Sequence, residues 1–447
     1  MTHSDQLKLI SVRNPLGRAL LAVPVALALL FAWYAARWYV GNFVAEFAPN
    51  MDQGQLEAAQ EAASLAPDDP WTHWIVAGLK KRNFSPEDLN EAIRQYEEAV
   101  RLSPYDYRFW IDLGRSKEEA GDSAGGERAL RRAVELAPHY AYTHWFLGNL
   151  LLRAGRGEEA FAELRRAAEA DPQLRPQLFN VAWTLYGQDI EAVRKAVADT
   201  PSARADFATY LAGQGRADDA LALWSSLSSA EKREASAPGR EIMRLLLSQK
   251  RYRSAFGVLS DIKPGMDPKA SQLINGGFEE DISSQAGDPF SWQVKMDPQA
   301  QVGIDESNSH GGSRSLLIFF RATEPLNFNN VSQTVVIEPS TQYRLEFYIR
   351  AEELKSAAAP VVQILDGADG ATVLGTSQPA PPGSYDWQPV TINFRTPPKT
   401  EAVIVVITRA RCDDPVCPIF GKVWYDDFNI QPVSGAVNQR GSGKANK

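Results

Sequence analysis

The sequence has few of the side chains that most often carry catalysis or bind metals, with two cysteines and five histidines among 447 residues. Its net charge of −8 at pH 7 gives no basic surplus, which a nucleic-acid-binding domain normally has. A structural zinc site would need a second pair of ligands beside Cys412 and Cys417, and no second pair of cysteines is present. A local disulfide in an oxidising compartment is therefore the better interpretation of this pair.

Sequence motifs of known enzymes are also missing. No H-E-x-x-H, G-x-S-x-G, P-loop or G-x-G-x-x-G element occurs in a fitting context. Two acidic pairs, Asp366/Asp369 and Asp413/Asp414, could serve a glycosidase only if they faced each other across a sugar. Asp366 and Asp369 each precede a glycine, which is typical of turns. We therefore expect no catalytic activity and no catalytic cofactor.

One long hydrophobic run is present, over residues 19–36, and it contains no charge. Spanning a bilayer takes about 17–25 apolar residues, so this run is long enough. Aromatic residues gather at its C-terminal end, as in an interfacial belt: Trp33, Tyr34, Trp38 and Tyr39. A cleavable signal peptide is the alternative, but its apolar region usually has only about 7–15 residues and precedes a small-residue cleavage site.

Basic residues precede the run, whereas the first charges beyond Arg37 are acidic. The positive-inside rule then places the N-terminus in the cytoplasm. We expect a bacterial inner-membrane protein with a cytoplasmic tail over 1–18, an uncleaved transmembrane signal anchor over 19–40, and the remainder in the periplasm.

A period of 34 residues organises the next part of the chain, because this spacing separates Pro104, Pro138 and Pro172. Such a period is typical of helix–turn–helix arrays. Small and large apolar residues recur with it, and their pattern resembles the tetratricopeptide repeat family. The matching positions are Trp74, Gly78, Ala92, Tyr96, Ala99, Trp110, Leu113, Gly114, Leu130, Ala133, Leu147, Gly148, Ala160, Leu164 and Ala167.

We expect five or six helical hairpins over 52–262. After a short linker at residues 48–50, the helix Gln55–Leu65 has the pattern of the second half of an incomplete first repeat. Ser85 is expected to cap a helix that has Pro86 in its first turn. Beyond Pro172 the pattern weakens.

The resemblance implies a concave groove that is lined by the first helix of each repeat and binds a partner protein. Its predicted lining is Arg108, Ile111, Arg115, Tyr142, Trp145, Asn149, Phe179 and Trp183. The alternative for each residue is packing between repeats. The family variant that clamps a carboxylate has Lys and Asn where this chain has Ile111/Arg115 and Trp145/Asn149, which puts that ligand in doubt.

After residues 263–265, a predicted linker, short alternating apolar runs separated by Gly, Pro and Asn indicate strands. The expected fold over 270–432 is an antiparallel β-sandwich or jelly roll. The motifs Asn275-Gly276-Gly277-Phe278-Glu279 and Trp424-Tyr425-Asp426-Asp427-Phe428 open and close it. With Trp292 and Trp387-Gln388-Pro389-Val390 between them, this part resembles carbohydrate-binding modules of the family 4/9/22 type. The tail 433–447 is expected to be disordered.

That resemblance implies a structural calcium ion and a sugar-binding face. The calcium ligands would be Glu279 with Asp427 or Asp426, since hard oxygen ligands suit this ion; the alternative is that these are solvated charges. If Tyr343, Leu345 and Phe347 point to the core, strand alternation turns their neighbours outward. The predicted glycan-binding residues are Gln333, Arg344, Tyr348, Arg350, Gln363 and Trp387. Many such domains have lost sugar binding and act as spacers.

The sequence thus predicts a multidomain α + β protein made of a transmembrane helix, a helical solenoid and an antiparallel β-sandwich. Its expected function is a non-catalytic envelope scaffold that binds a protein and a glycan, in exopolysaccharide or cell-surface polysaccharide assembly or export. The alternative is a purely protein-binding adaptor for secretion, pilus or envelope-complex assembly.

Overall fold

The computed structural model describes residues 15–51, 53–83, 85–263, 272–282, 288–324, 326–412 and 416–433. The predictions for residues 1–14, for the linker beyond Lys263, for Asp413/Asp414 and for the tail after residue 433 lie outside the described residues. By its internal contacts the chain divides into two compact units, Met1–Asp199 and Thr200–Lys447.

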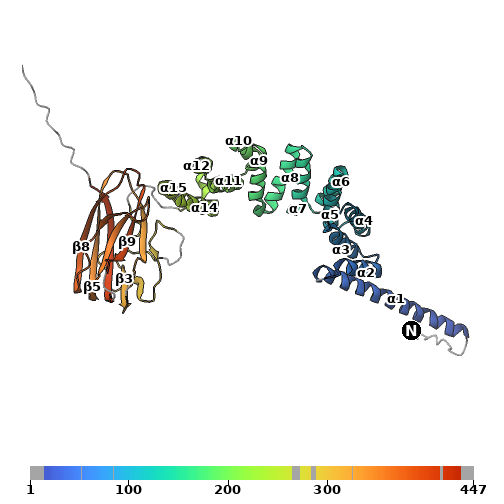
Figure 1. The fold of residues 1–447 in the computed structure, drawn as a ribbon, viewed down its shortest axis with the longest axis horizontal. Helices are drawn as coiled ribbons and strands as arrows, with labels where there is room; N and C mark the ends of the chain where they lie inside the picture. The colour runs from blue at the N-terminus through green and yellow to red at the C-terminus, as the bar shows by residue number, and fades with distance from the viewer. Residues whose placement is uncertain are drawn as a thin grey trace, which may run out of the picture. The chain divides into compact units, whose positions relative to one another are not determined.

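The first unit begins with α1 (Pro15–Phe47), a single helix of 33 residues that contains the apolar run and continues past it (Figure 1). Among the described residues it is the one helix long and apolar enough to cross a membrane, and its apolar window is entirely exposed. A signal sequence near the N-terminus can also meet these criteria of length and composition. The aromatic side chains Trp33 and Tyr34 are exposed on it.

The C-terminal part of α1 packs against α2 (Gln55–Leu65) as the first half of a helical hairpin. A side-chain carbon on Gly41 would lie 2.8 Å from Ala66 Cβ, so the two helices approach closely there. Ala45 and Ala48 are fully buried, and the Arg37 guanidinium donates to the Ser64 carbonyl over 2.8 Å.

The predicted linker at residues 48–50 is therefore wrong. These residues form a single 3₁₀ turn, η1 (Ala48–Asn50), at the end of α1. The first repeat is complete, because the helix that carries the apolar run supplies its missing half.

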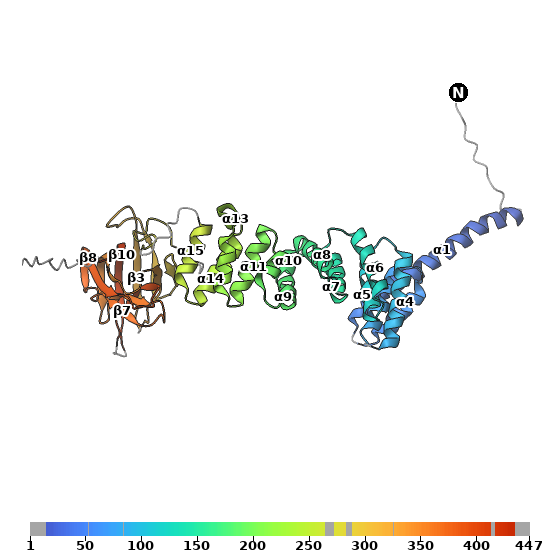
Figure 2. The same cartoon turned by 90° about the horizontal axis from the view of Figure 1, so that it is seen from above.

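Paired helices follow, and their hairpin partners lie side by side in both views (Figures 1 and 2). Ser85 caps α4 as predicted, accepting a hydrogen bond from the Asp88 backbone N–H over 3.0 Å. The helices of this stretch are α3 (Pro70–Lys81), α4 (Pro86–Leu102), α5 (Tyr107–Glu119), α6 (Ser123–Leu136), α7 (Ala141–Arg153), α8 (Gly157–Ala170), η2 (Pro172–Leu174), α9 (Arg175–Leu185) and α10 (Ile190–Val197).

The recurrent glycines explain the 34-residue period physically. A side-chain carbon on Gly114 would lie 2.7 Å from Leu130 Cγ, and one on Gly148 would lie 2.7 Å from Leu164 Cγ. At both positions the first helix of the pair touches a leucine of the second, so only glycine leaves room. The glycine positions of the repeat pattern therefore indicate where the paired helices lie closest together.

The second unit holds the remaining helices and the β-sandwich. α13 (Ser229–Glu234) is a short extra helix that interrupts the two-helix period. The helices are α11 (Pro201–Gly213), α12 (Ala217–Ser225), α13 (Ser229–Glu234), α14 (Ser236–Ser248) and α15 (Tyr252–Ile262).

In the part of the chain that the structure describes, the sandwich has two five-stranded antiparallel sheets, in the orders β1-β4-β9-β6-β7 (sheet A) and β2-β3-β10-β5-β8 (sheet B). Its core is filled by alternate residues of both sheets, such as Val331, Leu345, Phe347 and Val405. The alternating apolar runs of the sequence predict seven of these strands and miss β1, β2 and β7. The predicted strands are Ser315–Phe320, Val331–Ile337, Gln342–Ala351, Val361–Asp366, Gln388–Phe394, Ala402–Ala410 and Val423–Ile430. The strands are β1 (Gln293–Val294), β2 (Ala300–Asp305), β3 (Ser315–Ala322), β4 (Val331–Val336), β5 (Gln342–Ser356), β6 (Pro360–Asp366), β7 (Val373–Thr376), β8 (Gly383–Arg395), β9 (Ala402–Arg409) and β10 (Ile419–Pro432).

The last helix, α15, contacts the sandwich directly. The Tyr252 hydroxyl donates to the Gly367 carbonyl over 2.8 Å, and the Arg253 guanidinium bonds the Ile337 carbonyl over 3.0 Å. The ring of Phe256 lies edge-on to that of Phe290, with centroids 5.1 Å apart. The helical and β parts of this unit are therefore joined by side-chain contacts as well as by the connecting segment.

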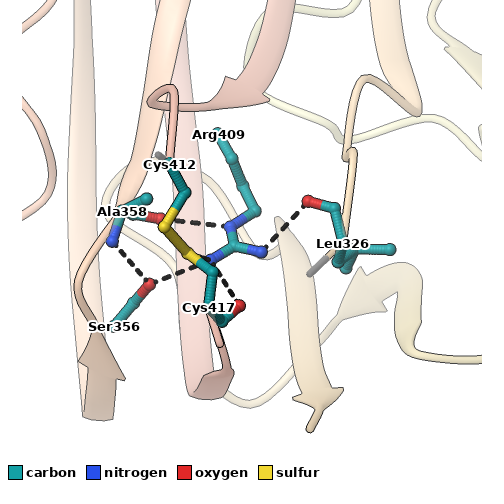
Figure 3. The surroundings of a disulfide bond; sticks show 6 residues. All are labelled: Leu326, Ser356, Ala358, Arg409, Cys412 and Cys417. Atoms are coloured by element: carbon teal, nitrogen blue, oxygen red, sulfur yellow. Dashed lines mark hydrogen bonds between the residues drawn. A yellow bond between two sulfur atoms is a disulfide. The ribbon is translucent and has the colours of Figure 1, made fainter. Parts of the chain in front are cut away.

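The predicted disulfide between Cys412 and Cys417 is present, beside a buried arginine (Figure 3). The Arg409 guanidinium donates to the carbonyl oxygens of Leu326, Ala358 and Cys417 over 3.0–3.2 Å. Burial lowers the pKa of Arg409. This side chain ties the strand ends and the disulfide loop into one hydrogen-bonded cluster.

Candidate functional site

The outer side of sheet B carries a group of aromatic and cationic side chains, which we name the aromatic face: His310, Tyr348, Arg350 and Trp387, with Trp424, which is only 2% exposed, packed beside Arg350. Strand alternation produces it, because Phe347 and Ile349 of β5 point into the core and leave Tyr348 and Arg350 on the other side. The structure thus places Tyr348 and Arg350 on the outer side, as predicted.

Rings on the aromatic face lie close together. The His310 ring stacks on Tyr348 with centroids 3.4 Å apart and planes inclined by 14°, and it meets Trp387 edge-on at 5.9 Å. The Arg350 guanidinium lies 5.4 Å from the centre of the Trp424 ring, in a cation–π arrangement. Such a surface combines flat apolar rings with directed polar groups, as sugar recognition requires.

Hydrogen bonds fix the polar groups of this face. The Trp424 indole N–H donates to Asp305 over 2.6 Å, and the Arg350 guanidinium donates to Asn308 over 2.8 Å. Burial acts to raise the pKa of Asp305, but hydrogen bonds from the Asn308 amide, the Ser307 backbone N–H and the Trp424 indole lower this pKa overall, so the carboxylate stays charged. The positions of Trp424 and Arg350 are therefore held by the loop that follows β2.

The sequence prediction missed His310, and it missed Trp424, which is buried and supports Arg350. Trp424 could have been found, because it lies between the inward-pointing Val423 and Tyr425 on β10. His310 lies in the loop before β3, where no periodicity indicates which way a side chain points.

Two predicted glycan-binding residues do not belong to the aromatic face. Gln333 is fully buried inside sheet A, and its amide bonds the backbone N–H and carbonyl of Ile274 over 3.1 and 2.8 Å. Gln363 is on β6, also in sheet A, between the core residues Val362 and Ile364 and hence on the outer side of that sheet. Arg344 is exposed on the same side of β5 as Tyr348, and its guanidinium lies 3.6 Å from Glu346.

The predicted calcium ligands surround the turn at residues 309–314. Glu279 accepts hydrogen bonds from the backbone N–H groups of Ser313 and Arg314 over 2.9 and 3.1 Å, and these lower its pKa. Asp426 is fully buried and accepts from the backbone N–H groups of His310 and Gly311. Asp427 lies 2.6 Å from the His310 ring nitrogen.

The oxygen donors suit calcium by type, and in this structure their carboxylates accept hydrogen bonds from protein groups. Each carboxylate is already held by protein donors, and within the described ranges no three acidic, His or Cys side chains gather as metal ligands. We therefore assign calcium no role in the mechanism.

Calcium binding stays a prediction that a melting experiment tests. Adding calcium to chelator-treated protein should leave the melting temperature unchanged if Glu279, Asp426 and Asp427 act only as hydrogen-bond acceptors. A rise in melting temperature with calcium would show that the turn rearranges to bind the ion.

The first unit contains a hollow of about 620 Å³, which we name the repeat groove. It brings together three of the predicted partner-binding residues, Arg115, Trp145 and Asn149. The Arg115 guanidinium lies 4.4 Å from the centre of the Phe146 ring. The rest of the lining is Lys81, Glu118, Glu119, Ser123, Phe146 and Arg153.

Ion pairs line the rim of the repeat groove. Arg153 pairs with Glu118 over 2.7 Å, and Lys81 pairs with Glu119 over 2.8 Å. The groove therefore offers an aromatic floor with charges of both signs around it, and such a surface suits an extended peptide segment.

The other predicted groove residues are not part of the lining of the repeat groove. Phe179 and Ile111 are 1% and 7% exposed, so they pack between helices. Arg108 is bound to Asp106, with Nη2 and Oδ2 2.6 Å apart. Tyr142 is exposed and continues the aromatic floor, with its ring 6.1 Å from that of Phe146. Trp183 is half-buried on α9 and does not line the repeat groove.

Comparisons with known proteins agree with this architecture. Residues 111–174 match the family model described as Tetratricopeptide repeat, and residues 270–414 match the model described as Carbohydrate binding domain. The chain carries a tetratricopeptide-repeat region and a carbohydrate-binding-module-like β-sandwich. The first match indicates protein–protein interaction and the second indicates carbohydrate binding. A search of curated proteins found no match.

Solved structures resemble separate parts of the chain. A structure described as "Crystal structure of MamA protein" is 14% identical, with a TM-score of 0.30, and the match covers 49% of this chain and 96% of that one. "MamA 41-end from Desulfovibrio magneticus RS-1" is 13% identical, with a TM-score of 0.32, covering 36% of this chain and 90% of that one. "CBM4 structure and function" is 18% identical, with a TM-score of 0.28, covering 36% of this chain and 100% of that one.

Proposed function

We propose that this protein is a membrane-anchored scaffold of a bacterial envelope that binds a polysaccharide through the aromatic face and a partner protein through the repeat groove. The observation that carries the proposal is the placement of two aromatic rings, Tyr348 of β5 and Trp387 of β8, on the outer side of sheet B, where His310 contacts both. The match to a carbohydrate binding domain supports it. Both matched families are typically non-catalytic, which supports a binding role in polysaccharide assembly or export.

Glycan binding by the aromatic face has a direct test with a matched control. Replacing Tyr348 or Trp387 by alanine removes a ring that would stack on a sugar, and each change should weaken polysaccharide binding about tenfold. Gln363→Ala, on sheet A, should leave binding unchanged. The measurement is calorimetric titration of the full chain with a panel of bacterial and plant polysaccharides. Equal binding by all three variants would place the glycan elsewhere.

The alternative function is a protein adaptor whose sandwich binds no sugar. The stacking of His310 on Tyr348 at 3.4 Å favours it, because the histidine ring covers the tyrosine ring where a sugar would lie. His310→Ala separates the two functions: it should uncover Tyr348 and raise glycan affinity if the face binds sugar. Failure of every polysaccharide to bind this variant would favour the adaptor.

The partner protein is proposed to bind the repeat groove as an extended segment. A photo-crosslinking amino acid in place of Asn149 should join the chain to a partner in cells, whereas the same amino acid in place of the exposed Glu135 on α6 should not. Trp145→Ala should reduce the Asn149 cross-link, since it removes the floor of the groove. A cross-link of equal yield from both positions would contradict this site.

An uncleaved anchor is proposed because α1 continues without interruption into the first hairpin. Cleavage just beyond the apolar run would remove Tyr34, whose hydroxyl donates to Asp68 over 2.8 Å. It would also leave Gly41 and Ala45 on a shortened, frayed helix opposite α2. The packing of α1 on α2 thus supports a chain that keeps its apolar helix. The basic residues that precede the apolar run support an N-terminus in the cytoplasm, with both binding surfaces on the other side of the membrane.

A further inference from the structure

The sandwich contains a second cavity that is separate from the aromatic face. It has a volume of about 300 Å³ and lies on the inner side of the sheets, where Phe347 and Ile349 of β5, Val362 of β6 and Tyr425 of β10 line it. Tyr348, between the first two of these, points to the opposite surface. The cavity is therefore distinct from the proposed glycan site.

The lengths of the two edge strands explain why the cavity exists. β7 is the edge of sheet A and has four residues, whereas β8 is the edge of sheet B and has thirteen. Where both strands are present they meet closely: a side-chain carbon on Gly375 would lie 2.8 Å from Ile392 Cγ2. Beyond Thr376 the edge of sheet A is replaced by the segment 377–381, and the cavity lies between this segment and Gln388–Thr391.

The segment 377–381 is held as a wall of the cavity. Its Ser377 and Ala380 N–H groups donate to the carbonyl oxygens of Val362 and Pro360, each over 2.9 Å. Pro379 and Pro381, which also line the cavity, have no N–H to offer a ligand. The wall therefore contributes the apolar surface of Pro379, Ala380 and Pro381 together with the polar side chains of Ser377 and Gln378.

One buried polar atom points to a ligand. Tyr425 is 1% exposed, lines the cavity, and its hydroxyl has no hydrogen-bond partner among the described residues. Burial raises the pKa of Tyr425, so the hydroxyl keeps its proton and remains a donor. A buried hydroxyl without a partner is destabilising, and such groups usually have a water or a ligand as their missing partner.

We propose that this cavity binds a small, uncharged, mainly apolar molecule that accepts a hydrogen bond from the Tyr425 hydroxyl, such as the end of an acyl chain with its ester carbonyl. Among the described residues, no Asp, Glu, Lys, Arg or His side chain lines the cavity, which disfavours a charged ligand. The volume has room for roughly ten non-hydrogen atoms, since a water molecule occupies about 30 Å³ of liquid.

The test compares an ester with a hydrocarbon of the same size. The full chain in lipid nanodiscs, with labelled methyl groups, is titrated with ethyl butanoate or with n-octane while methyl spectra are recorded. The methyl signals of Ile349 and Val362 should shift, and that of Val403, which is buried but does not line the cavity, should not. Both probes partition into the same nanodiscs for every variant, so the probe affinities measured for different variants can be compared directly.

Two variants complete the test. Tyr425→Phe removes only the hydroxyl and should weaken ethyl butanoate binding about tenfold without changing n-octane binding. Ala380→Trp fills the cavity and should abolish the shifts for both probes. Shifts at all methyls, no shifts at all, or equal effects of Tyr425→Phe on both probes would overturn the proposal, since they indicate unspecific partition or a cavity that holds only water.

Discussion

Replacing Gly148 by valine is expected to destabilise the α7–α8 hairpin by about 3 kcal/mol. A side-chain carbon at this position would lie 2.7 Å from Leu164 Cγ and 3.0 Å from the Ala160 carbonyl oxygen. The carbonyl belongs to the backbone of α8 and cannot move unless the helix moves. A valine therefore forces apart two helices whose close contact defines the repeat.

The measurement is hydrogen exchange of backbone amides in α7 and α8, which reports local unfolding in a repeat array. Gly157→Ala in the same hairpin is the matched control, because a side-chain carbon there meets no atom within 4 Å among the described residues. The control should exchange as slowly as the original chain or more slowly. If the backbone amides of α7 and α8 exchanged as slowly in the valine variant as in the original chain, this result would contradict the close packing of α7 on α8.

Replacing Arg409 by methionine is expected to lower the free energy of unfolding of the sandwich by about 4 kcal/mol. Arg409 is 9% exposed, and its guanidinium satisfies three backbone carbonyl oxygens and the hydroxyl of Ser356 (Figure 3). Methionine keeps much of the apolar volume but leaves these acceptors unpaired, and each buried unpaired group costs about 1–3 kcal/mol. Water that enters the site and donates to these acceptors would make the loss in free energy of unfolding smaller.

Denaturant unfolding of the full chain, followed by the near-ultraviolet signal of the sandwich tryptophans, measures this loss. Arg395→Met, at an exposed position on β8, is the control and should change the free energy of unfolding by less than about 0.5 kcal/mol. If both variants unfold at the same denaturant concentration, the hydrogen-bonded cluster around the disulfide contributes little to stability.

The sequence predicted those parts of the fold that depend on a regular period. The 34-residue spacing located α3 to α8, because it reflects the contact of Gly114 and Gly148 with leucines of the partner helices. Alternation along β5 placed Tyr348 and Arg350 on the outer side. The same rule could have excluded Gln333, since it lies on one side of β4 with Val331 and Val335, which point to the core.

Other features depend on contacts between segments far apart in the chain, and no local pattern reports them. The sequence pattern of α1 predicts a membrane segment alone. Gly41 and Ala45 pack on α2, but beside a long apolar run nothing in the sequence distinguishes them as helix-contact residues. His310 reaches Tyr348 from a loop, and Tyr252 reaches Gly367 across more than a hundred residues of sequence. Gln363 was misplaced because β6 has apolar residues on both sides, so alternation does not show which side faces the core.

The most direct test of the proposed scaffold is retention of polysaccharide by the full chain in lipid vesicles. Vesicles that carry the chain are sedimented with a polysaccharide that the titrations select, and the bound fraction is compared for the original chain, Tyr348→Ala and Gln363→Ala. We predict that polysaccharide sediments with the original chain and with Gln363→Ala, and remains largely in solution with Tyr348→Ala. Protein that stays in the supernatant would contradict the anchor, and vesicle-bound protein that retains no polysaccharide would contradict the glycan-binding function.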